Sequence, residues 1–126
     1  MSKNTISAPL APPAVGPYSH AVVANGFVFT AGQVGLVPGT KQLVAGGIRE
    51  QTAQALDNVK AVLQAAGSDL EKVVKTTVFL ANMDDYATMN EVYAQYFWRA
   101  QPARSAVQVA KLPLGALVEI ETIALV

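Results

Sequence analysis

Arg104 and Glu119 are charged residues at positions where the surrounding pattern predicts β-strands. Arg104 opens a strand over 104–109, and Glu119 lies inside a strand over 117–125. An arginine can grip a carboxylate through two parallel hydrogen bonds, and it stays charged when buried because its pKa exceeds about 12. A partly buried glutamate whose pKa is shifted towards neutrality can hold or deprotonate a water molecule. The pair can therefore bind a carboxylate and activate water, but a structural Arg–Glu pair or two solvent-facing edge charges fit the same pattern.

The composition argues against several other kinds of site. The chain has no cysteine, which excludes a disulfide scaffold, a thiolate nucleophile and the usual zinc clusters. One histidine, His20, makes a His-rich metal site or a Ser-His-Asp triad nearly impossible within one chain, and we expect it to be an exposed or hydrogen-bonded strand residue. Nine basic and nine acidic residues cancel, so no strong field attracts nucleic acid. We expect no metal, no cofactor and no nucleic-acid partner.

Two further features of the sequence give little support for a binding or catalytic site. The run Gly32-Gln33-Val34-Gly35 follows a predicted strand but lacks the glycine spacing of a phosphate-binding loop. Ser105 stands beside Arg104 with no base evident nearby in the sequence. The aromatic residues between Tyr86 and Phe97 repeat at helical spacing, which predicts core packing rather than a platform for stacked bases.

Hydrophobic periodicity predicts the elements that must position Arg104 and Glu119. The expected order is β-β-(β)-α-β-α-β-β, with strands over 18–24, 27–31, 72–81, 104–109 and 117–125, a possible short strand near 43–44, and helices over 48–66 and from a cap at Asn82 or Asp84 to Phe97. Asn25-Gly26 predicts a tight hairpin turn. Four prolines in residues 1–17 predict an extended N-terminal arm.

This order predicts an α+β fold with two helices on one face of a mixed sheet. The 126 residues are expected to form a single domain, 1–126, with the arm at its start. Only 14% of the residues are charged, where about 25% is usual, and the second face of the sheet is partly apolar. We therefore expect part of the surface to be hidden against another subunit. With no apolar run of 18 residues and no signal peptide, we expect no membrane partner and a cytoplasmic location.

Five segments together resemble one protein family. They are GPYSHA at 16–21, FTAGQ at 29–33, the run from Leu56 to Phe97, PARSAVQVAKLP at 102–113 and VEIETIA at 118–124. In this order and spacing they resemble the Rid or YjgF family, the reactive-intermediate imine and enamine deaminases that are also called L-PSP endoribonucleases or translation initiation inhibitors. The resemblance extends from about Ala14 to Leu125.

The resemblance implies a chorismate-mutase-like fold in which three subunits pack their sheets into a barrel-like core. The homotrimer would hold its sites in clefts between neighbouring subunits. The implied reaction is hydrolysis of 2-imino acids, or of their enamine tautomers, to 2-keto acids and ammonia. Because an iminium carbon is already electrophilic, this reaction requires neither a metal nor a covalent nucleophile.

By the same resemblance, Arg104 of the PARS motif would bind the substrate carboxylate. Glu119 of VEIE would hold and activate the attacking water. Tyr18 of GPYS would line the pocket and contact the substrate or water through its hydroxyl. Asn90 would be a supporting polar residue.

The resemblance also places Ala31, Gly32 and Ala106 at the substrate, with main-chain groups around Gly32 and Ala106 in contact with it. The family commonly has serine at Ala31 and often cysteine at Ala106. A missing serine hydroxyl removes one hydrogen bond, worth about 0.5–1.5 kcal/mol. Lys111 and Gln101 also differ from the residues most frequent in the family.

Three functions remain open from the sequence. The first is an imine deaminase. The second is a non-catalytic or chaperone-like trimer that binds a small carboxylate in the same cleft, which the residues Ala31 and Ala106 favour. The third is a ribonuclease or translation inhibitor, against which zero net charge and a single histidine argue.

Overall fold

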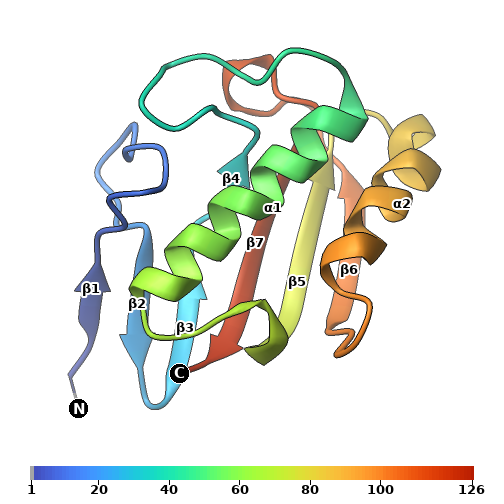
Figure 1. Cartoon of the computed structure of the whole chain (residues 1–126). Coiled ribbons are helices and arrows are strands. Elements are labelled where there is room, and N and C mark those ends of the chain that lie inside the picture. Colours follow the sequence, from blue (N-terminus) through green and yellow to red (C-terminus); the bar gives the residue numbers. More distant parts are fainter. Residues whose placement is uncertain (1) are drawn as a thin grey trace.

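The computed structural model, which describes residues 2–126, shows a mixed sheet with two helices packed on one face (Figure 1). The strands are β1 (Asn4–Ile6), β2 (Ala21–Ala24), β3 (Phe27–Thr30), β4 (Gln33–Val34), β5 (Val73–Leu80), β6 (Ala103–Gln108) and β7 (Val118–Leu125). The helices are α1 (Ile48–Ala65) and α2 (Tyr86–Tyr96), and short 3-10 turns lie at Leu70–Lys72, Met83–Asp85 and Pro113–Gly115.

The strand order is β1-β2-β3-β7-β5-β6, with β4 also paired to β7. Strands β5 and β6 are the parallel pair, because α2 carries the chain back across the sheet between them. Strand β7, the last in the chain, lies in the middle of the sheet and pairs with β3, β4 and β5. Strand β6 ends the order and is therefore an edge strand.

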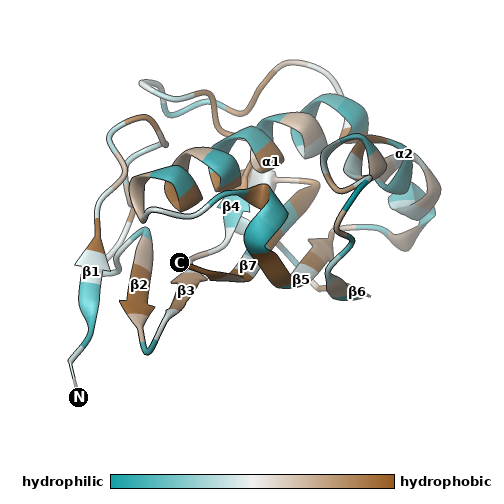
Figure 2. Ribbon diagram, turned by 60° about the horizontal axis from the view of Figure 1, so that its bottom comes forward, coloured by the Kyte–Doolittle hydropathy of each residue, from teal (hydrophilic) through white to brown (hydrophobic). Residues whose placement is uncertain are grey.

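The core lies between the helices and the sheet. Alternation along β7 buries Val118, Ile120 and Ala124 completely, while the residues between them face the other way. The ribbon in Figure 2 shows the brown apolar stripe of α1 turned towards the strands. The opposite face of the sheet is open and apolar in part, because four of its side chains are exposed by two-fifths or more: Phe29, Val74, Val107 and Leu125.

Most predicted elements are present with boundaries shifted by one to three residues. Two strands, β1 and β4, were not predicted. The arm contains strand β1, which pairs with β2, and strand β4 follows the β2–β3 hairpin. The expected strand near 43–44 is only a single bridge between Leu36 and Leu43. Neither Asn82 nor Asp84 caps α2, whose N-cap is Asp85; Asn82 instead caps the 3-10 turn that precedes the helix.

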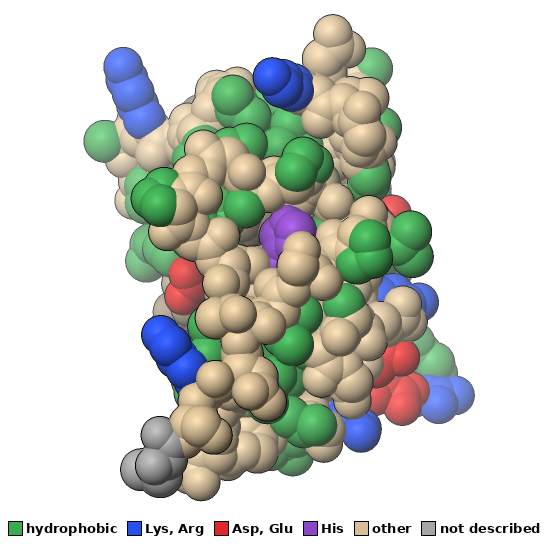
Figure 3. Space-filling model, turned by 90° about the vertical axis from the view of Figure 1, so that its left-hand side faces the viewer, with side chains coloured by type: hydrophobic (Ala, Val, Ile, Leu, Met, Phe, Trp, Pro, Cys, Tyr) green, Lys and Arg blue, Asp and Glu red, His purple; other side chains and the backbone are tan. Residues whose placement is uncertain are grey.

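The predicted strand over 18–24 begins only at Ala21, because the residues before it anchor the N-terminal arm. His20 is 6% exposed, and one ring nitrogen accepts the Ala8 backbone N–H at 2.8 Å. The other ring nitrogen donates to the Pro12 carbonyl at 2.7 Å. Figure 3 looks onto this region, where the ring is seen only in part among the surrounding atoms. His20 is thus hydrogen-bonded and buried rather than exposed, and it precedes the strand instead of lying within it.

Asn58 fastens the segment after β4 to α1, and we expect its loss to destabilise the fold. Its side chain is 1% exposed and donates to the carbonyls of Val34 at 3.1 Å and Leu36 at 2.9 Å. The substitution Asn58→Ala leaves both buried carbonyls without their hydrogen-bond donor. Each unsatisfied carbonyl lowers the stability of the fold by about 1–3 kcal/mol. We expect the free energy of unfolding to fall by about 2–6 kcal/mol, measured by urea denaturation. The surface substitution Gln64→Ala is the control, and a loss below about 0.5 kcal/mol in Asn58→Ala would contradict the assignment.

Candidate active site

Arg104 points to the face of the sheet that the helices cover. In the β5–β6 pair Arg104 lies beside Thr76, and in the β5–β7 pair Thr76 lies beside Thr122. Residues paired in this way project to the same face of a sheet. Thr76 is fully buried there, where its hydroxyl lies 2.8 Å from that of Tyr93 on α2. Ala106 shares this face, as the alternation of the sequence predicts.

The guanidinium of Arg104 is surrounded by neutral groups. Its Nη2 donates to the Tyr86 hydroxyl at 3.0 Å, and its central carbon lies 4.6 Å from the ring centre of Tyr93. Among residues 2–126 the ion pairs are Arg49–Glu91 and Arg99–Glu71, so Arg104 has no carboxylate partner within the described chain. Its positive charge is therefore free for an anion.

A cavity adjoins Arg104 between α2 and the edge strand. It is lined by Asn90, Tyr93, Ala94, Phe97, Gln101, Pro102 and Arg104. The side-chain oxygen of Asn90 is buried without a hydrogen-bond donor in the described structure. Asn90 and Arg104, predicted as separate site residues, are thus brought together. Of the aromatic residues expected in the core, Tyr93 and Phe97 are buried as predicted, whereas Tyr86 is 38% exposed. Tyr93 also contacts Arg104.

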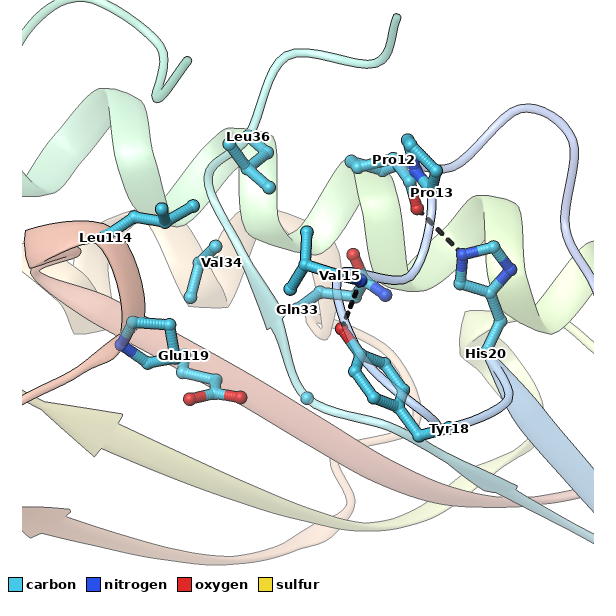
Figure 4. Close-up of a pocket in the computed structure, with 12 residues that line it drawn as sticks. Pro12, Pro13, Val15, Tyr18, His20, Gln33, Val34, Leu36, Leu114 and Glu119 are labelled. Carbon is cyan, nitrogen blue, oxygen red and sulfur yellow. Dashed lines mark hydrogen bonds between the residues drawn. The ribbon is translucent and has the colours of Figure 1, made fainter. Parts of the chain in front are cut away.

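Glu119 points to the opposite face of the sheet. Its neighbours Val118 and Ile120 are fully buried beneath the helices, so alternation sends the Glu119 side chain to the other side. There it lies beside Val34 of β4 and lines a pocket with Tyr18 and Gly32. Figure 4 shows that β7 supplies Glu119, the segment before β2 supplies Tyr18, and the segment after β4 supplies Leu36.

Glu119 is held in a way that suits a proton acceptor. Burial and the nearby charge of Glu121 both raise the pKa of Glu119 above its ordinary value of 4.5. Gly32 makes room for the carboxylate, since a Cβ at that position would collide with Glu119 Oε2. Like Arg104, Glu119 has no ion-pair partner among residues 2–126.

The remaining predicted site residues lie on the Glu119 side. The Tyr18 hydroxyl accepts the Val15 backbone N–H at 3.2 Å, and the Tyr18 side chain is about half exposed. The Ala31 N–H donates to the His20 carbonyl at 2.9 Å, and Ala31 directly precedes Gly32, which lines the pocket. Leu114 lines the same pocket from a left-handed backbone conformation with φ of 61°, a strained geometry for a leucine.

The candidate residues therefore form two half-sites on opposite faces of the sheet. Arg104, Asn90 and Ala106 lie on the helix-covered face, whereas Glu119 and Gly32 lie on the other. A structural pair between Arg104 and Glu119 within one chain, one of the alternatives left open by the sequence, does not form. Arg104 and Glu119 thus line different pockets of this chain.

Sequence reasoning missed Tyr86 as a neighbour of Arg104. It stands 18 residues from Arg104, and only the return of the chain through α2 brings the two together. Its helical spacing within the aromatic stripe pointed to the core instead. Within residues 2–126 no three His, Cys, Asp or Glu side chains gather as a metal site would need, and no helix is long and apolar enough to span a membrane.

Comparisons with known proteins agree in family and fold. The model of the family described as endoribonuclease L-PSP matches residues 8–126. A 2-iminobutanoate/2-iminopropanoate deaminase of Mus musculus is 52% identical over 122 residues, covering 97% of this chain and 90% of the relative. A Rid-family protein of Yersinia pestis, YyfA, has a crystal structure that matches with a TM-score of 0.95 at 47% identity, covering 99% and 100% of the two chains. The structure of E. coli TdcF with bound serine matches with a TM-score of 0.91 at 42% identity, covering 98% of each chain.

Proposed function

Since this chain belongs to the endoribonuclease L-PSP family, also known as the Rid or YjgF family, we propose that it hydrolyses 2-imino acids to 2-keto acids and ammonia. It is an enzyme of the 2-iminobutanoate/2-iminopropanoate deaminase type. One observation carries the proposal most directly. In a chain poor in charge, an arginine and a glutamate in the sheet have no ion-pair partner among residues 2–126, and both line pockets.

Arg104 binds the carboxylate that every 2-imino acid carries. Its guanidinium has five N–H groups, of which Tyr86 takes one, so enough remain for a bidentate grip. The bound serine of TdcF also carries a carboxylate, which supports a ligand of this class for the present chain. The electron-withdrawing iminium then lies at a fixed position relative to the guanidinium.

Glu119 activates the water that attacks the iminium carbon. A lone pair of the water oxygen forms the C–O bond while the C=N π pair moves to nitrogen, and Glu119 takes the proton that the water loses. Protonated Glu119 passes this proton to the amine nitrogen. The C–N bond then breaks, ammonia leaves, and the hydroxyl oxygen becomes the keto group as its proton returns to Glu119 and then to solvent. Tyr18 lines the water side of the site through its hydroxyl, and Gly32 keeps the approach to Glu119 open.

The complete site lies between subunits of a homotrimer in this proposal. Arg104 is on edge strand β6, where a neighbouring chain can approach, and the open sheet face carries exposed Phe29, Val107 and Leu125. Burying such apolar area stabilises an assembly by about 25 cal/mol for each Å² removed from water. One chain would supply Arg104, Asn90 and Ala106, and its neighbour would supply the Glu119 half.

Subunit mixing tests both the reaction and the shared site. The substrate is made in place by an amino-acid oxidase, and semicarbazide traps any imine that the protein does not hydrolyse. We expect Arg104→Leu and Glu119→Gln to be inactive alone. Co-expressed in equal amounts, they should recover about a quarter of wild-type activity, because one site in four combines an intact Arg104 with an intact Glu119.

A matched control mixes Glu119→Gln with the double variant Arg104→Leu/Glu119→Gln, which contains no intact Glu119 and should stay inactive. Light scattering verifies that each mixture keeps its assembly. No recovery in intact mixed trimers would show that the site is not shared between chains. If the wild-type protein binds a 2-keto acid yet never lowers trapping, the chain is a carboxylate-binding module instead of a deaminase.

A further inference from the structure

Arg104 is fixed to α2 by neutral side chains. The Tyr86 oxygen receives the Arg104 Nη2 hydrogen bond at 3.0 Å, and the guanidinium carbon lies 5.5 Å from the Tyr86 ring centre and 4.6 Å from that of Tyr93. The Tyr93 ring is itself anchored, since its hydroxyl lies 2.8 Å from the buried Thr76 hydroxyl. An arginine that would otherwise sample many rotamers is therefore held between two rings and one oxygen.

Tyr86 lies close to Asn90 as well as to Arg104. It is the first residue of α2, one turn before Asn90, and the polar side chain of Asn90 and the charge of Arg104 lower the pKa of Tyr86. Tyr86 is 38% exposed, so its ring contributes little to the core. The Tyr86 hydroxyl therefore lies beside Arg104 and Asn90, two residues of the half-site that would bind the substrate carboxylate.

A phenol is a suitable partner for an arginine that must bind an anion. A carboxylate in the place of the Tyr86 oxygen would fix the guanidinium but neutralise it, whereas a hydroxyl fixes it and leaves its full charge. The Tyr86 hydroxyl occupies one N–H of the Arg104 guanidinium, so that other N–H groups remain to bind the two carboxylate oxygens. Substrate binding then costs less conformational entropy of the Arg104 side chain than it would if the arginine were mobile.

We propose that Tyr86 is a positioning residue for carboxylate recognition, whose hydroxyl holds the Arg104 guanidinium in the orientation that grips the substrate. The inference rests on the proposed function, because it assigns Arg104 to the carboxylate. Tyr86 acts through Arg104 and does not itself touch the reacting atoms. Its removal should therefore weaken binding while leaving the chemical step of bound substrate unchanged.

The test is Tyr86→Phe, which removes one oxygen and keeps the ring. We expect the dissociation constant of 2-oxobutanoate, a stable 2-keto acid probe, to rise about five- to twentyfold by calorimetry. In the semicarbazide assay kcat/KM should fall by the same factor while kcat stays within about twofold. Tyr96→Phe is the matched control, because it also loses hydroxyl hydrogen bonds, to the Ala53 carbonyl and Asp57, away from Arg104.

A double-mutant cycle separates this inference from the proposed function. If Tyr86 acts through Arg104, adding Tyr86→Phe to Arg104→Leu produces no further loss of 2-oxobutanoate binding. An unchanged dissociation constant in Tyr86→Phe, or an equal further loss in the Arg104→Leu background, overturns the positioning role alone. If Arg104→Leu itself binds 2-oxobutanoate as tightly as the wild type, the assignment of Arg104 fails and this inference fails with it.

Discussion

Replacing Glu119 by glutamine is expected to lower kcat for imine hydrolysis by about 10²- to 10⁴-fold, the usual contribution of a positioned general base. Glutamine has nearly the same shape, so Gly32 still accommodates it, but its amide cannot take a proton from water. Binding of 2-oxobutanoate should stay within a few-fold, because the carboxylate is held on the other half-site. Steady-state assays measure kcat, and calorimetry measures the binding of 2-oxobutanoate. A variant that keeps more than a tenth of wild-type kcat would rule out Glu119 as the base.

The pH dependence follows from the same residue. Glu119 must be ionised to accept a proton, and its pKa is raised above 4.5 by burial and by Glu121. Activity should therefore be full at high pH and fall as the pH drops through a value above 4.5. Glu121→Gln removes the like charge, so it should retain activity at neutral pH and move the acid limb to lower pH. An acid limb that does not move would show that Glu121 does not act on the base.

Replacing Arg104 by leucine is expected to lower kcat/KM by 10²-fold or more and to raise the dissociation constant of 2-oxobutanoate by a similar factor. Each hydrogen bond from the guanidinium to a carboxylate is worth about 1.5–3 kcal/mol, and two are lost together. About 1.4 kcal/mol corresponds to a factor of ten. Leucine preserves contact with Tyr86 and Tyr93, so the fold should persist and the melting temperature serves as the check.

A control arginine distinguishes this effect from a general loss of charge. Arg99 stacks on exposed Trp98 and pairs with Glu71 at 3.6 Å on the surface, outside both half-sites. Arg99→Leu should keep kcat/KM within about twofold, since such exposed pairs contribute little. Equal losses in Arg99→Leu and Arg104→Leu would contradict a specific carboxylate site at Arg104.

Local patterns were sufficient to place most of the elements. The two-residue period of the final strand predicts that Glu119 and Glu121 share a face, and the pairing with β5 agrees. The helical repeat from Ile48 predicts α1, which ends at Ala65. Strand β1 in the N-terminal arm could not be predicted, because it forms only by pairing with β2 and its three residues carry almost no periodic signal of their own.

Local sequence patterns were enough to predict an arginine and a glutamate within strands where apolar residues are expected, and motifs along almost the whole chain identified the family. The relative positions of the two residues depend on tertiary contacts. The central position of β7 and the parallel pairing of β6 send Arg104 and Glu119 to opposite faces of the sheet. Side-chain alternation is a property of neighbouring residues, whereas strand order depends on contacts between segments far apart in the chain. For the same reason no local pattern could place Tyr86 beside Arg104.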